Sequence, residues 1–322
     1  MKIIFIGTPD FAVNSLERLI KDGNDVCLVI TQPDRRANRN RMIAPPVKVL
    51  ASEHGIEIAQ PQNINKDETL KEKMRSMEAD IIIVAAYGQI LKKDILNMPR
   101  MGCFNVHASL LPRFRGASPI QQAIIAGDKK TGVSIMKMEE GLDAGAVWKR
   151  LTTETGSKKY TELSKELSEL GAVLLSEFIS AMEDGNIKFY PQDDSKASYA
   201  PMITKKDGVL DFHEDPCRVE RMMRAFDPWP GLSCRLGGYD VKLWKVNAVN
   251  AKHMCSESEN VSTKDACSNV DATGTKPNGM ILDTSNGVID VSCGGGILRI
   301  EELQIPGKKR MSAQDFLRGH KL

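Results

Sequence analysis

The alternation of short apolar runs with segments of helical periodicity in the first half of the chain is the feature that most constrains the fold. Five apolar runs are predicted to be strands: residues 2–6, 25–31, 80–86, 103–107 and 132–138. Apolar residues at helical spacing predict helices at residues 10–21 and 46–54. This pattern is typical of parallel strands covered by helices, so we predict an α/β fold with a doubly wound sheet. Ligand sites in such sheets lie at the carboxyl ends of the strands.

The second half of the chain predicts a different architecture. A long helix is expected over residues 160–182, and the polar, proline-bracketed segment 190–201 is typical of an interdomain linker. After a helix at 216–226, short alternating runs predict a small β-barrel; they are residues 232–236, 239–249, 280–283, 288–292 and 298–305. We therefore predict a domain over residues 1–189, a linker over 190–206 and a second domain over 207–322. Segment 251–278 lacks aromatic residues and is expected to be a mobile loop.

Composition excludes several classes of protein. The 44 basic and 42 acidic residues give a net charge of +2, which argues against a protein that coats nucleic acid. The seven cysteines show neither C-x-x-C spacing nor an even count, so we expect reduced thiols and no zinc site. The apolar run at the N-terminus is too short for a signal peptide or a membrane span. These observations predict a cytoplasmic location, with no membrane partner.

The turn after the first predicted strand excludes a dinucleotide site. It reads Gly7-Thr8-Pro9-Asp10, whereas G-x-G-x-x-G is needed for pyrophosphate to approach the backbone. The sequence also contains no G-x-x-x-x-G-K-[ST] motif for a P-loop nucleotide. The sheet is therefore expected to be Rossmann-like in build only.

The densest group of chemically useful side chains begins at Asn105 and His107, at the end of a predicted strand. Residues two apart point to the same face of a strand, so this amide and imidazole are expected side by side, with Phe104 and Val106 facing the other way. Such a pair can stabilise a developing oxyanion. An isolated Asn-x-His pair is more often structural. Here the position at a strand end, beside a loop that contains proline and glycine, makes a functional role at least as well supported as a structural one.

A carboxylate is expected to join this pair. Asp143 lies between Gly141 and Gly145, directly after the strand predicted to end at residue 138, and the two glycines indicate a tight loop. There Asp143 could orient His107, favour its protonated form and pass a proton. The alternative is that Asp143 is an Asx-turn residue.

Basic side chains concentrate in one loop. Arg35, Arg36, Arg39 and Arg41 stand within seven positions, with no acidic residue among them, and such a loop can reach phosphates. The alternative is a solvated surface loop. Lys308 and Lys309 precede a short helix predicted at residues 312–318, and could extend a nucleic-acid surface or be solvated.

Motifs along nearly the whole chain resemble the methionyl-tRNA formyltransferase family. They include Gly7-Thr-Pro-Asp-Phe-Ala12, Asn105-Val-His-Ala-Ser-Leu-Leu-Pro112, Gly141-Leu-Asp-Ala-Gly145, Phe226-Asp-Pro-Trp-Pro230 and Met311-Ser-Ala-Gln-Asp315. The resemblance implies a Rossmann-like formyltransferase domain followed by an OB-like barrel that binds tRNA. It implies transfer of a formyl group from 10-formyltetrahydrofolate to the α-amino group of methionyl initiator tRNA, for translation initiation.

The resemblance also implies roles for single residues. Asn105, His107 and Asp143 match its catalytic positions, and no metal is required. Folate is expected to contact Ser109, Leu110, Leu111, Pro112, Tyr87, Gly88, Ile90 and Leu91. The tRNA is expected to contact Arg35, Arg36, Arg39, Arg41, Lys308 and Lys309. Asn38-Arg39-Asn40-Arg41 replaces the Gly-Arg-Gly-Lys-like core that is usual in the loop of this family. We expect a monomer.

Two alternatives stay open. One is another 10-formyltetrahydrofolate-dependent formyltransferase that acts on a sugar amine or a purine precursor, because the Asn-x-His pair with a downstream Asp is shared among such enzymes. The Pro-Trp-Pro segment and the barrel argue against a purine enzyme. The other is a non-catalytic tRNA-binding module, which is disfavoured because all three polar residues are present.

Overall fold

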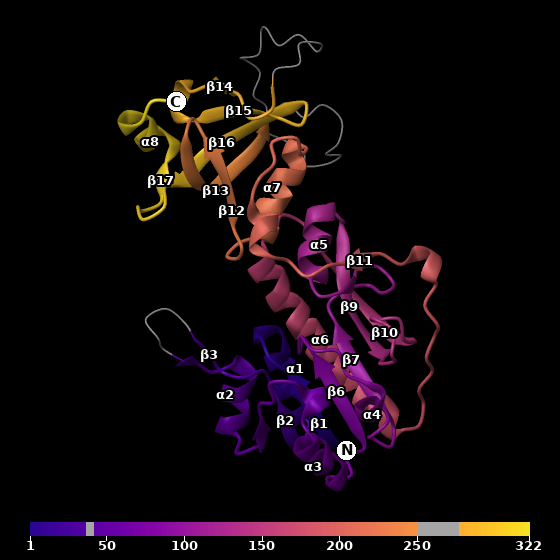
Figure 1. Ribbon diagram of the computed structural model, residues 1–322. Helices are drawn as coiled ribbons and strands as arrows, with labels where there is room; N and C mark the ends of the chain where they lie inside the picture. The colour runs from indigo at the N-terminus through magenta and orange to yellow at the C-terminus, as the bar shows by residue number, and fades with distance from the viewer. Residues whose placement is uncertain (37–41, 250–276) are drawn as a thin grey trace. The chain divides into compact units, whose positions relative to one another are not determined.

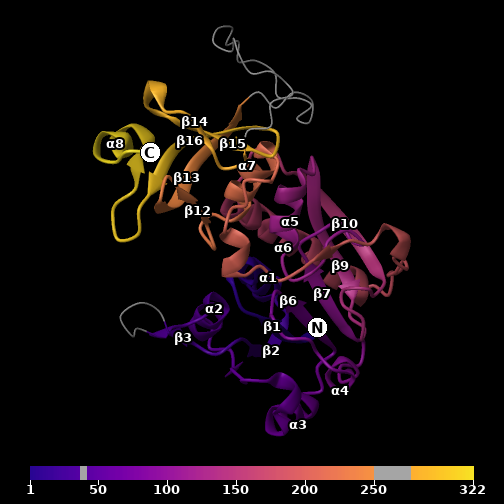
Figure 2. The same cartoon turned by 45° about the horizontal axis from the view of Figure 1, so that its top comes forward.

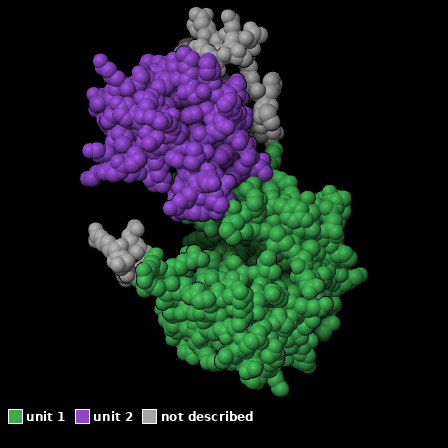
Figure 3. Space-filling model, in the orientation of Figure 1, with its two compact units in different colours: residues 1–123, 128–202 green, residues 124–127, 203–322 purple. Residues whose placement is uncertain are grey.

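The computed structural model describes residues 1–36, 42–249 and 277–322 (Figure 1). Arg39, Arg41 and almost all of the loop predicted to be mobile lie outside the described residues. The chain forms two compact units (Figure 3). Unit 1 comprises residues 1–123 and 128–202, and unit 2 comprises residues 124–127 and 203–322.

Unit 1 is built on a seven-stranded sheet with the order β10-β9-β7-β6-β1-β2-β5. Five of its strands are mutually parallel: β1 (Lys2–Gly7), β2 (Asp25–Ile30), β5 (Ile58–Ala59), β6 (Ile81–Ala85) and β7 (Cys103–His107). Strand β9 (Lys130–Lys137) runs antiparallel to β7, and β10 (Val147–Glu154) runs antiparallel to β9.

All five predicted strands are present, but β9 is not parallel to its neighbour β7, which corrects the expected topology. The short loop between β9 and β10 returns the chain as a hairpin, without a crossover helix. The strands β5 and β10 were not predicted. β5 has two residues, and β10 is an edge strand in which exposed polar residues interrupt the apolar ones.

Helices cover both faces of this sheet. Helix α1 (Asp10–Lys21) has its predicted bounds, and α2 (Pro46–Glu53) and α6 (Tyr160–Glu183) each end within a residue of theirs. Helices α1 and α6 pack against each other. Helices α3 (Glu68–Ser76), α4 (Lys93–Leu96) and α5 (Pro119–Ala126) were not predicted. Alternate residues of the central strands, such as Ile4 and Ile82, share one apolar cluster with α3 and α4.

The close approach of neighbouring atoms explains why the turn after β1 begins with a glycine, Gly7. A Cβ at this position would lie 2.8 Å from the Cβ of Ala12 and 2.9 Å from the carbonyl oxygen of Ala85. Real Cβ atoms do not approach other atoms so closely, so glycine is required where α1 begins beside β1 and β6. The glycine serves close packing here.

The segment predicted to be an interdomain linker is divided between the two units. Residues 190–202 belong to unit 1 and residues 203–206 to unit 2. The first part contains a short helix, η3 (Asp194–Lys196), and the strand β11 (Tyr199–Ala200), which pairs in parallel with β8 (Arg115–Gly116). The backbone of residues 190–201 is therefore hydrogen-bonded to the body of unit 1.

Unit 2 contains the predicted short strands in an antiparallel sheet of the order β12-β13-β16-β15-β14, and β17 pairs with β16. The strands are β12 (Leu232–Leu236), β13 (Tyr239–Val249), β14 (Ile281–Asp283), β15 (Ile289–Cys293), β16 (Gly296–Gln304) and β17 (Met311–Ser312). Unit 2 also has the helices η4 (Lys205–Gly208), α7 (Pro216–Ala225), η5 (Ser285–Gly287) and α8 (Ala313–Gly319). Helix α8 lies beside β17 and β16 (Figures 1 and 2). The Ser312 hydroxyl accepts from the Asp315 N–H and caps the first turn of α8.

The Phe226-Asp-Pro-Trp-Pro turn corrects one expectation. Its sequence predicts a turn that proline and glycine fix and that Trp229 anchors. Trp229 is 50% exposed, whereas Phe226 is 3% exposed. Phe226 is therefore the anchor, and burial of its ring supplies the apolar contact that holds the turn.

Candidate active site

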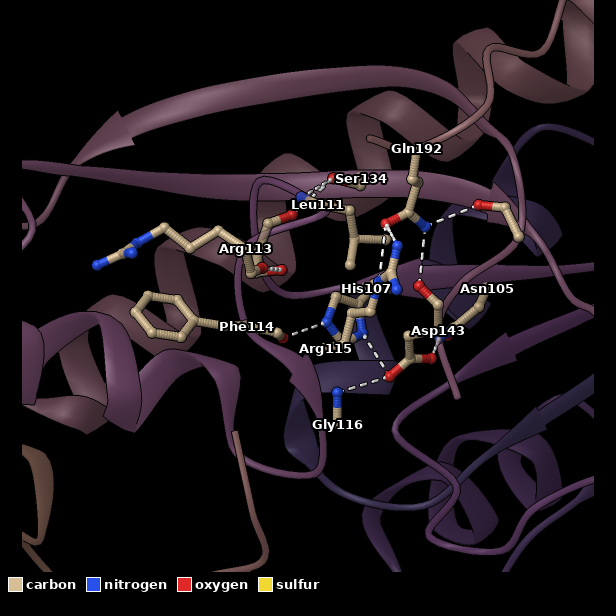
Figure 4. A network of polar contacts seen from close by, with 12 residues as sticks. Asn105, His107, Leu111, Arg113, Phe114, Arg115, Gly116, Ser134, Asp143 and Gln192 are labelled. Atoms are coloured by element: carbon tan, nitrogen blue, oxygen red, sulfur yellow. Dashed lines mark hydrogen bonds and ion pairs between the residues drawn. The ribbon is translucent and has the colours of Figure 1, made fainter. Parts of the chain in front are cut away.

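His107 lies at the carboxyl end of β7, with 5% of its surface exposed. Its Nε2 atom is 3.0 Å from the carbonyl oxygen of Phe114 (Figure 4). A carbonyl oxygen can only accept a hydrogen bond, so Nε2 carries a hydrogen and donates it. Nδ1 faces Asp143, at 3.7 Å from its Oδ2 atom. Nδ1 is therefore the nitrogen that can gain or release a proton beside a carboxylate.

Asn105 lies on the same side of β7 as His107, as the two-residue spacing predicts (Figure 4). Its Nδ2 donates towards Oδ1 of Asp143 at 3.5 Å. Phe104 and Val106, which alternate with this pair along β7, face α6: the ring of Phe104 lies 4.8 Å from that of Phe178, and Val106 lies beside Gly171. This apolar packing fixes the strand and leaves the amide and imidazole together on its other face.

Asp143 reaches this pair by a loop that doubles back. Because β9 is antiparallel to β7, the chain leaves β9 beside Cys103, whose carbonyl accepts from the Met138 N–H at 2.8 Å. Residues 139–146 then return until the Lys137 N–H donates to Ala146. Asp143 therefore approaches His107 from a loop that begins beside the first residue of β7, and not from the carboxyl end of a parallel strand.

Two glycines make this arrangement possible. The Gly116 N–H donates to Oδ2 of Asp143 at 2.8 Å, from a backbone with φ of +113° that favours glycine. At Gly145 a Cβ would lie 1.8 Å from the carbonyl oxygen of Lys137. The Asp143 side chain is 13% exposed. Two donors, the Asn105 amide and the Gly116 N–H, thus face one nearly buried carboxylate. The His107 ring faces it with Nδ1, which donates only when the ring is protonated.

Several groups at this site were not identified from the sequence. The Phe114 carbonyl and the Gly116 N–H are backbone groups, which carry no residue-type signal. Gln192 donates from Nε2 to the carbonyls of Asp143 and Gly145, at 2.8 and 2.7 Å. Its position in a polar, proline-bracketed stretch is typical of a linker, so no local pattern distinguishes it.

The residues predicted for folate binding include a structural turn. Ser109 is fully buried, and its hydroxyl donates to the Arg113 carbonyl at 2.6 Å. The Ser134 hydroxyl donates to the Ser109 carbonyl and accepts from the Leu111 N–H. Leu111 is buried, while Leu110 and Pro112 are half-buried. The polar groups of this turn are thus largely occupied by the protein itself.

The residues of the second predicted folate segment differ in their exposure to solvent. Tyr87 and Leu91 are buried, Gly88 is exposed, and Ile90 is 73% exposed. The Tyr87 hydroxyl has no hydrogen-bond partner among the described residues, and burial raises its pKa to about 12. This phenol therefore stays protonated at neutral pH. Exposed Ile90 offers an apolar contact to a ligand, whereas buried Leu91 contributes to the core.

An open cleft of about 620 Å³ lies at the first residue of β7 and the beginning of the loop that carries Asp143. Its lining comprises Lys93, Leu96, Asn97, Pro99, Arg100, Met101, Gly102, Cys103, Lys137, Met138, Glu139, Glu140 and Gly141. Burial raises the pKa of the Cys103 thiol to about 12, so this wall is uncharged there. The predicted folate residues do not line the cleft, but Gly141 stands two positions before Asp143. The volume is in the range of small-molecule sites.

The described part of the basic loop forms a hairpin. β3 (Arg35–Arg36) pairs with β4 (Met42–Ile43), and all four residues are exposed. At its base the Lys48 ammonium lies 2.8 Å from both carboxylate oxygens of Asp34, and the Gln60 amide donates to the same carboxylate. Lys308 and Lys309 are exposed in unit 2. The structure thus gives four of the six predicted tRNA contacts an exposed position.

The described residues meet neither the requirements for a metal site of three or more ligands nor those for a membrane-spanning helix. Within the described ranges, no group of three or more His, Cys, Asp or Glu side chains is arranged to hold a metal ion. In the same part of the chain, no helix combines the length and apolar composition needed to cross a membrane.

Comparison with known proteins identifies relatives over the whole chain. Residues 1–179 match the family model for formyl transferase, and residues 202–321 match that for the formyl transferase C-terminal domain. A methionyl-tRNA formyltransferase of Geobacter metallireducens is 42% identical over 100% of this chain and 96% of its own. One from Methylobacillus flagellatus is 43% identical over 100% of this chain and 97% of its own.

A solved structure extends the comparison to the fold. The N-formyltransferase from Helicobacter canadensis, in complex with folinic acid and dTDP-3-aminofucose, superposes with a TM-score of 0.63. It covers 93% of this chain and 98% of its own at 17% identity, a likeness that concerns the fold alone. The identity of more than 40% to the two relatives extends over both units, and on these grounds the chain belongs to the methionyl-tRNA formyltransferase family.

Proposed function

We propose that the chain transfers a formyl group from 10-formyltetrahydrofolate to the α-amino group of methionyl initiator tRNA. The observation that carries the proposal is the meeting of Asn105, His107 and Asp143 at one point, in a chain whose relatives over its whole length are methionyl-tRNA formyltransferases. The three side chains supply a donor, a proton carrier and a carboxylate. Such groups can accelerate acyl transfer to an amine by stabilising the oxyanion and moving protons.

The reaction follows from the positions of these atoms. The unprotonated amine attacks the formyl carbon. The π electrons of the formyl C=O bond move to its oxygen, which gives a tetrahedral oxyanion. Asn105 donates from Nδ2, and His107 donates from Nδ1 when it is protonated, so the negative charge develops in front of two fixed donors. The C–N10 bond then breaks. The amine loses one proton and N10 gains one, and we assign this transfer to His107 with Asp143.

The Phe114 carbonyl contributes to this mechanism by fixing the hydrogen on Nε2. Protonation and deprotonation are then confined to Nδ1, which faces Asp143. When His107 gains a proton, the carboxylate stabilises the imidazolium at close range in a nearly buried environment. The pair can thus alternate between donor and acceptor without ring rotation.

The cleft beside Gly141 is our proposed place for part of the folate. Cys103, Met138 and Leu96 offer an uncharged wall, while backbone groups of residues 139–141 can meet the polar edge of a pterin. Lys93, Arg100 and Lys137 could pair with carboxylates of the glutamate tail. Ile90 and Ser109–Pro112 remain candidates for contacts outside the cleft. We assign no catalytic step to a metal.

For the tRNA we propose contacts at exposed cations. Arg35 and Arg36 on the hairpin, Arg39 and Arg41 beyond it, and Lys308 and Lys309 can meet phosphates. In this proposal residues 1–189 form the catalytic domain and residues 207–322 the OB-like, tRNA-binding domain, with residues 190–206 joining them. We further propose that the protein acts in the cytoplasm, as a monomer.

The sugar-amine alternative receives less support. The Helicobacter canadensis enzyme resembles this chain in fold at 17% identity, whereas the tRNA-modifying relatives are more than 40% identical over both units. A change of acceptor is most readily achieved by changing the parts of the chain that bind it. An alignment with the tRNA-modifying relatives that spans unit 2 as well as unit 1 therefore favours the tRNA acceptor.

The deciding experiment measures formyl transfer to methionyl initiator tRNA with 10-formyltetrahydrofolate, and identifies formylmethionine after hydrolysis of the ester. Methionyl elongator tRNA and a dTDP-amino sugar serve as parallel acceptors. We expect formylmethionine with the initiator tRNA. Absence of product at every enzyme concentration, or faster transfer to the sugar, would reject the proposal.

A further inference from the structure

The loop that carries Asp143 is held by a side chain from a distant part of the sequence. Gln192 donates both hydrogens of its amide nitrogen, one to the carbonyl of Asp143 at 2.8 Å and one to that of Gly145 at 2.7 Å (Figure 4). These carbonyls lie on either side of Ala144. The amide therefore bridges the backbone where the loop turns back towards β10.

Arg115 fixes the orientation of this amide. Its Nε and Nη2 atoms donate to Oε1 of Gln192 at 3.1 and 2.9 Å. An arginine can only donate, so the carbonyl oxygen of the Gln192 side chain must face it and the NH₂ group must face the loop. Every hydrogen-bonding position of the amide that can reach the loop is then in use. A side chain without this polarity would leave two loop carbonyls without their donor.

Arg115 is itself well fixed. It is 3% exposed, and its Nη2 also pairs with Asp194 at 2.7 Å. Its backbone N–H donates to the Ser198 carbonyl at 2.8 Å, within the pairing of β8 with β11. The charge is thus satisfied by partners from residues 192–198 alone, and the arginine and this segment hold each other in place.

The same segment also reaches the other half of the catalytic pair. The Ser198 hydroxyl accepts from the Phe114 N–H at 2.9 Å, and the Phe114 carbonyl accepts from His107. Residues 192–198 therefore contact the backbone on both sides of the His107–Asp143 pair. A separation of 3.7 Å between Nδ1 and Oδ2 is sensitive to small shifts of either loop.

We propose that Gln192 is a positioning residue, which holds the Asp143 loop against His107 through its two backbone carbonyls, with Arg115 as its orienting partner. The inference rests on the proposed formyl transfer and deepens it. Gln192 itself touches no reacting atom. Its effect is on the geometry of the carboxylate, so it should act on the chemical step and leave substrate affinity in place.

Two substitutions test the amide. Gln192→Leu removes its donors and its acceptor at similar size. Gln192→Glu keeps an acceptor for Arg115 but places a carboxylate oxygen against two carbonyls. For both we expect kcat to fall about 10²-fold, as for a small misplacement of a catalytic group, with KM for tRNA and folate changed less than about threefold. Ser195→Ala, on the same segment with its side chain bonded to Asp193, is the matched control.

A double-variant cycle separates positioning from a general structural defect. In an Asp143→Asn background, the carboxylate to be positioned is absent, so Gln192→Leu should cost little further activity. A loss of about 10²-fold in both backgrounds, or a wild-type kcat in the single variants, would overturn the proposal.

Hydrogen–deuterium exchange provides a readout that does not depend on activity. Amides of residues 139–146 should exchange faster in both Gln192 variants than in Ser195→Ala, while exchange in β1 and β6 stays unchanged. Unchanged exchange in the loop would overturn the positioning role even if a variant is inactive. If the wild-type protein itself showed no formyl transfer, the proposed function would be rejected. The exchange data would still show whether Gln192 holds the loop.

Discussion

Two polar segments of unit 1, the Asp143 loop (residues 138–146) and the basic hairpin (residues 34–43), are held in contrasting ways. The Asp143 loop is bonded at both ends to the sheet and along its length by Gly116 and Gln192. The described part of the hairpin is fixed at its base, where Asp34 meets Lys48 and Gln60, and its strands are exposed.

This difference corresponds to what each segment is proposed to contact. A carboxylate that stabilises a transition state must be fixed before the reaction, because any movement lowers the stabilisation it can supply. Cations that meet phosphates act over longer distances, and their contribution depends on charge and accessibility. Rigid support is therefore expected around Asp143, and exposure is expected on the hairpin. Substitutions in the two segments should consequently change different kinetic parameters.

The largest effect is expected at the centre of the supported region. His107→Ala removes both a donor and the proton carrier, so kcat should fall by roughly 10²- to 10⁴-fold, with tRNA binding unchanged. Steady-state kinetics and a filter-binding assay measure the two quantities. His54, which is exposed at the end of α2, gives a matched control as His54→Ala. A kcat within threefold of the wild type would show that the imidazole is structural.

A slightly smaller effect is expected from a methyl group in the Asp143 loop. Gly145→Ala places a Cβ 1.8 Å from the Lys137 carbonyl oxygen, so the backbone must shift. Overpacking of this kind destabilises proteins by about 1–3 kcal/mol, and here the shift should also lower kcat by about 10²-fold. Urea unfolding and kinetics provide the measurements. Gly319→Ala, which meets open space, is the control; equal behaviour of the two variants would contradict the need for a tight loop.

The contrast between the two segments also explains how far the sequence could predict the site. Period-two alternation placed Asn105 and His107 on one face of β7, because the faces of a strand are determined by residue spacing. The paired glycines of the Asp143 loop predicted a tight turn, and this is also present. Such features depend on neighbours in the sequence, and local patterns report them.

The remaining features depend on residues distant in the sequence. The direction of β9 is set by its antiparallel pairing with β7, which lies more than twenty residues upstream. The edge strand β10 was not predicted because exposed polar residues interrupt its apolar ones. The role of residues 192–198 depends on Arg115 and on a loop about fifty residues upstream. The composition of this segment is typical of a linker and does not indicate these contacts. The Phe114 carbonyl and the Gly116 N–H belong to the backbone and leave no trace in residue type. Trp229 was predicted to anchor its turn, but Phe226 is the ring that the fold buries.

A moderate effect is expected at the base of the hairpin. Asp34→Ala removes the acceptor for Lys48 and Gln60, so the hairpin should become less well oriented. Both side chains of the pair are 28% exposed, and ion pairs within reach of solvent are weak. We therefore expect KM for tRNA to rise by up to about fivefold, with kcat unchanged. A fall in kcat with constant KM would contradict the division of roles between the hairpin and the Asp143 loop.

The smallest effect on activity is expected at a carboxylate that belongs to neither segment. Asp80 accepts from the Lys2 N–H at 2.9 Å and from Arg100 at 2.7 Å, and these bonds lower its pKa. A lowered pKa in the folded state means that the stabilisation is complete above the pKa of the unfolded chain. It is lost as the pH falls through the pKa of the folded state. Asp80→Asn should thus reduce stability by about 1–2 kcal/mol at pH 7 and leave kcat unchanged.

The pH dependence of unfolding distinguishes this stabilisation from a general packing defect. The difference in unfolding free energy between Asp80→Asn and the wild type should shrink as the pH falls below about 4, since the wild-type carboxyl is then protonated as well. Arg100→Ala removes the more exposed partner, and its cost should stay below about 1 kcal/mol. A constant difference from pH 7 to pH 3 would assign the loss to packing, and a changed kcat would extend the catalytic network to the start of β6.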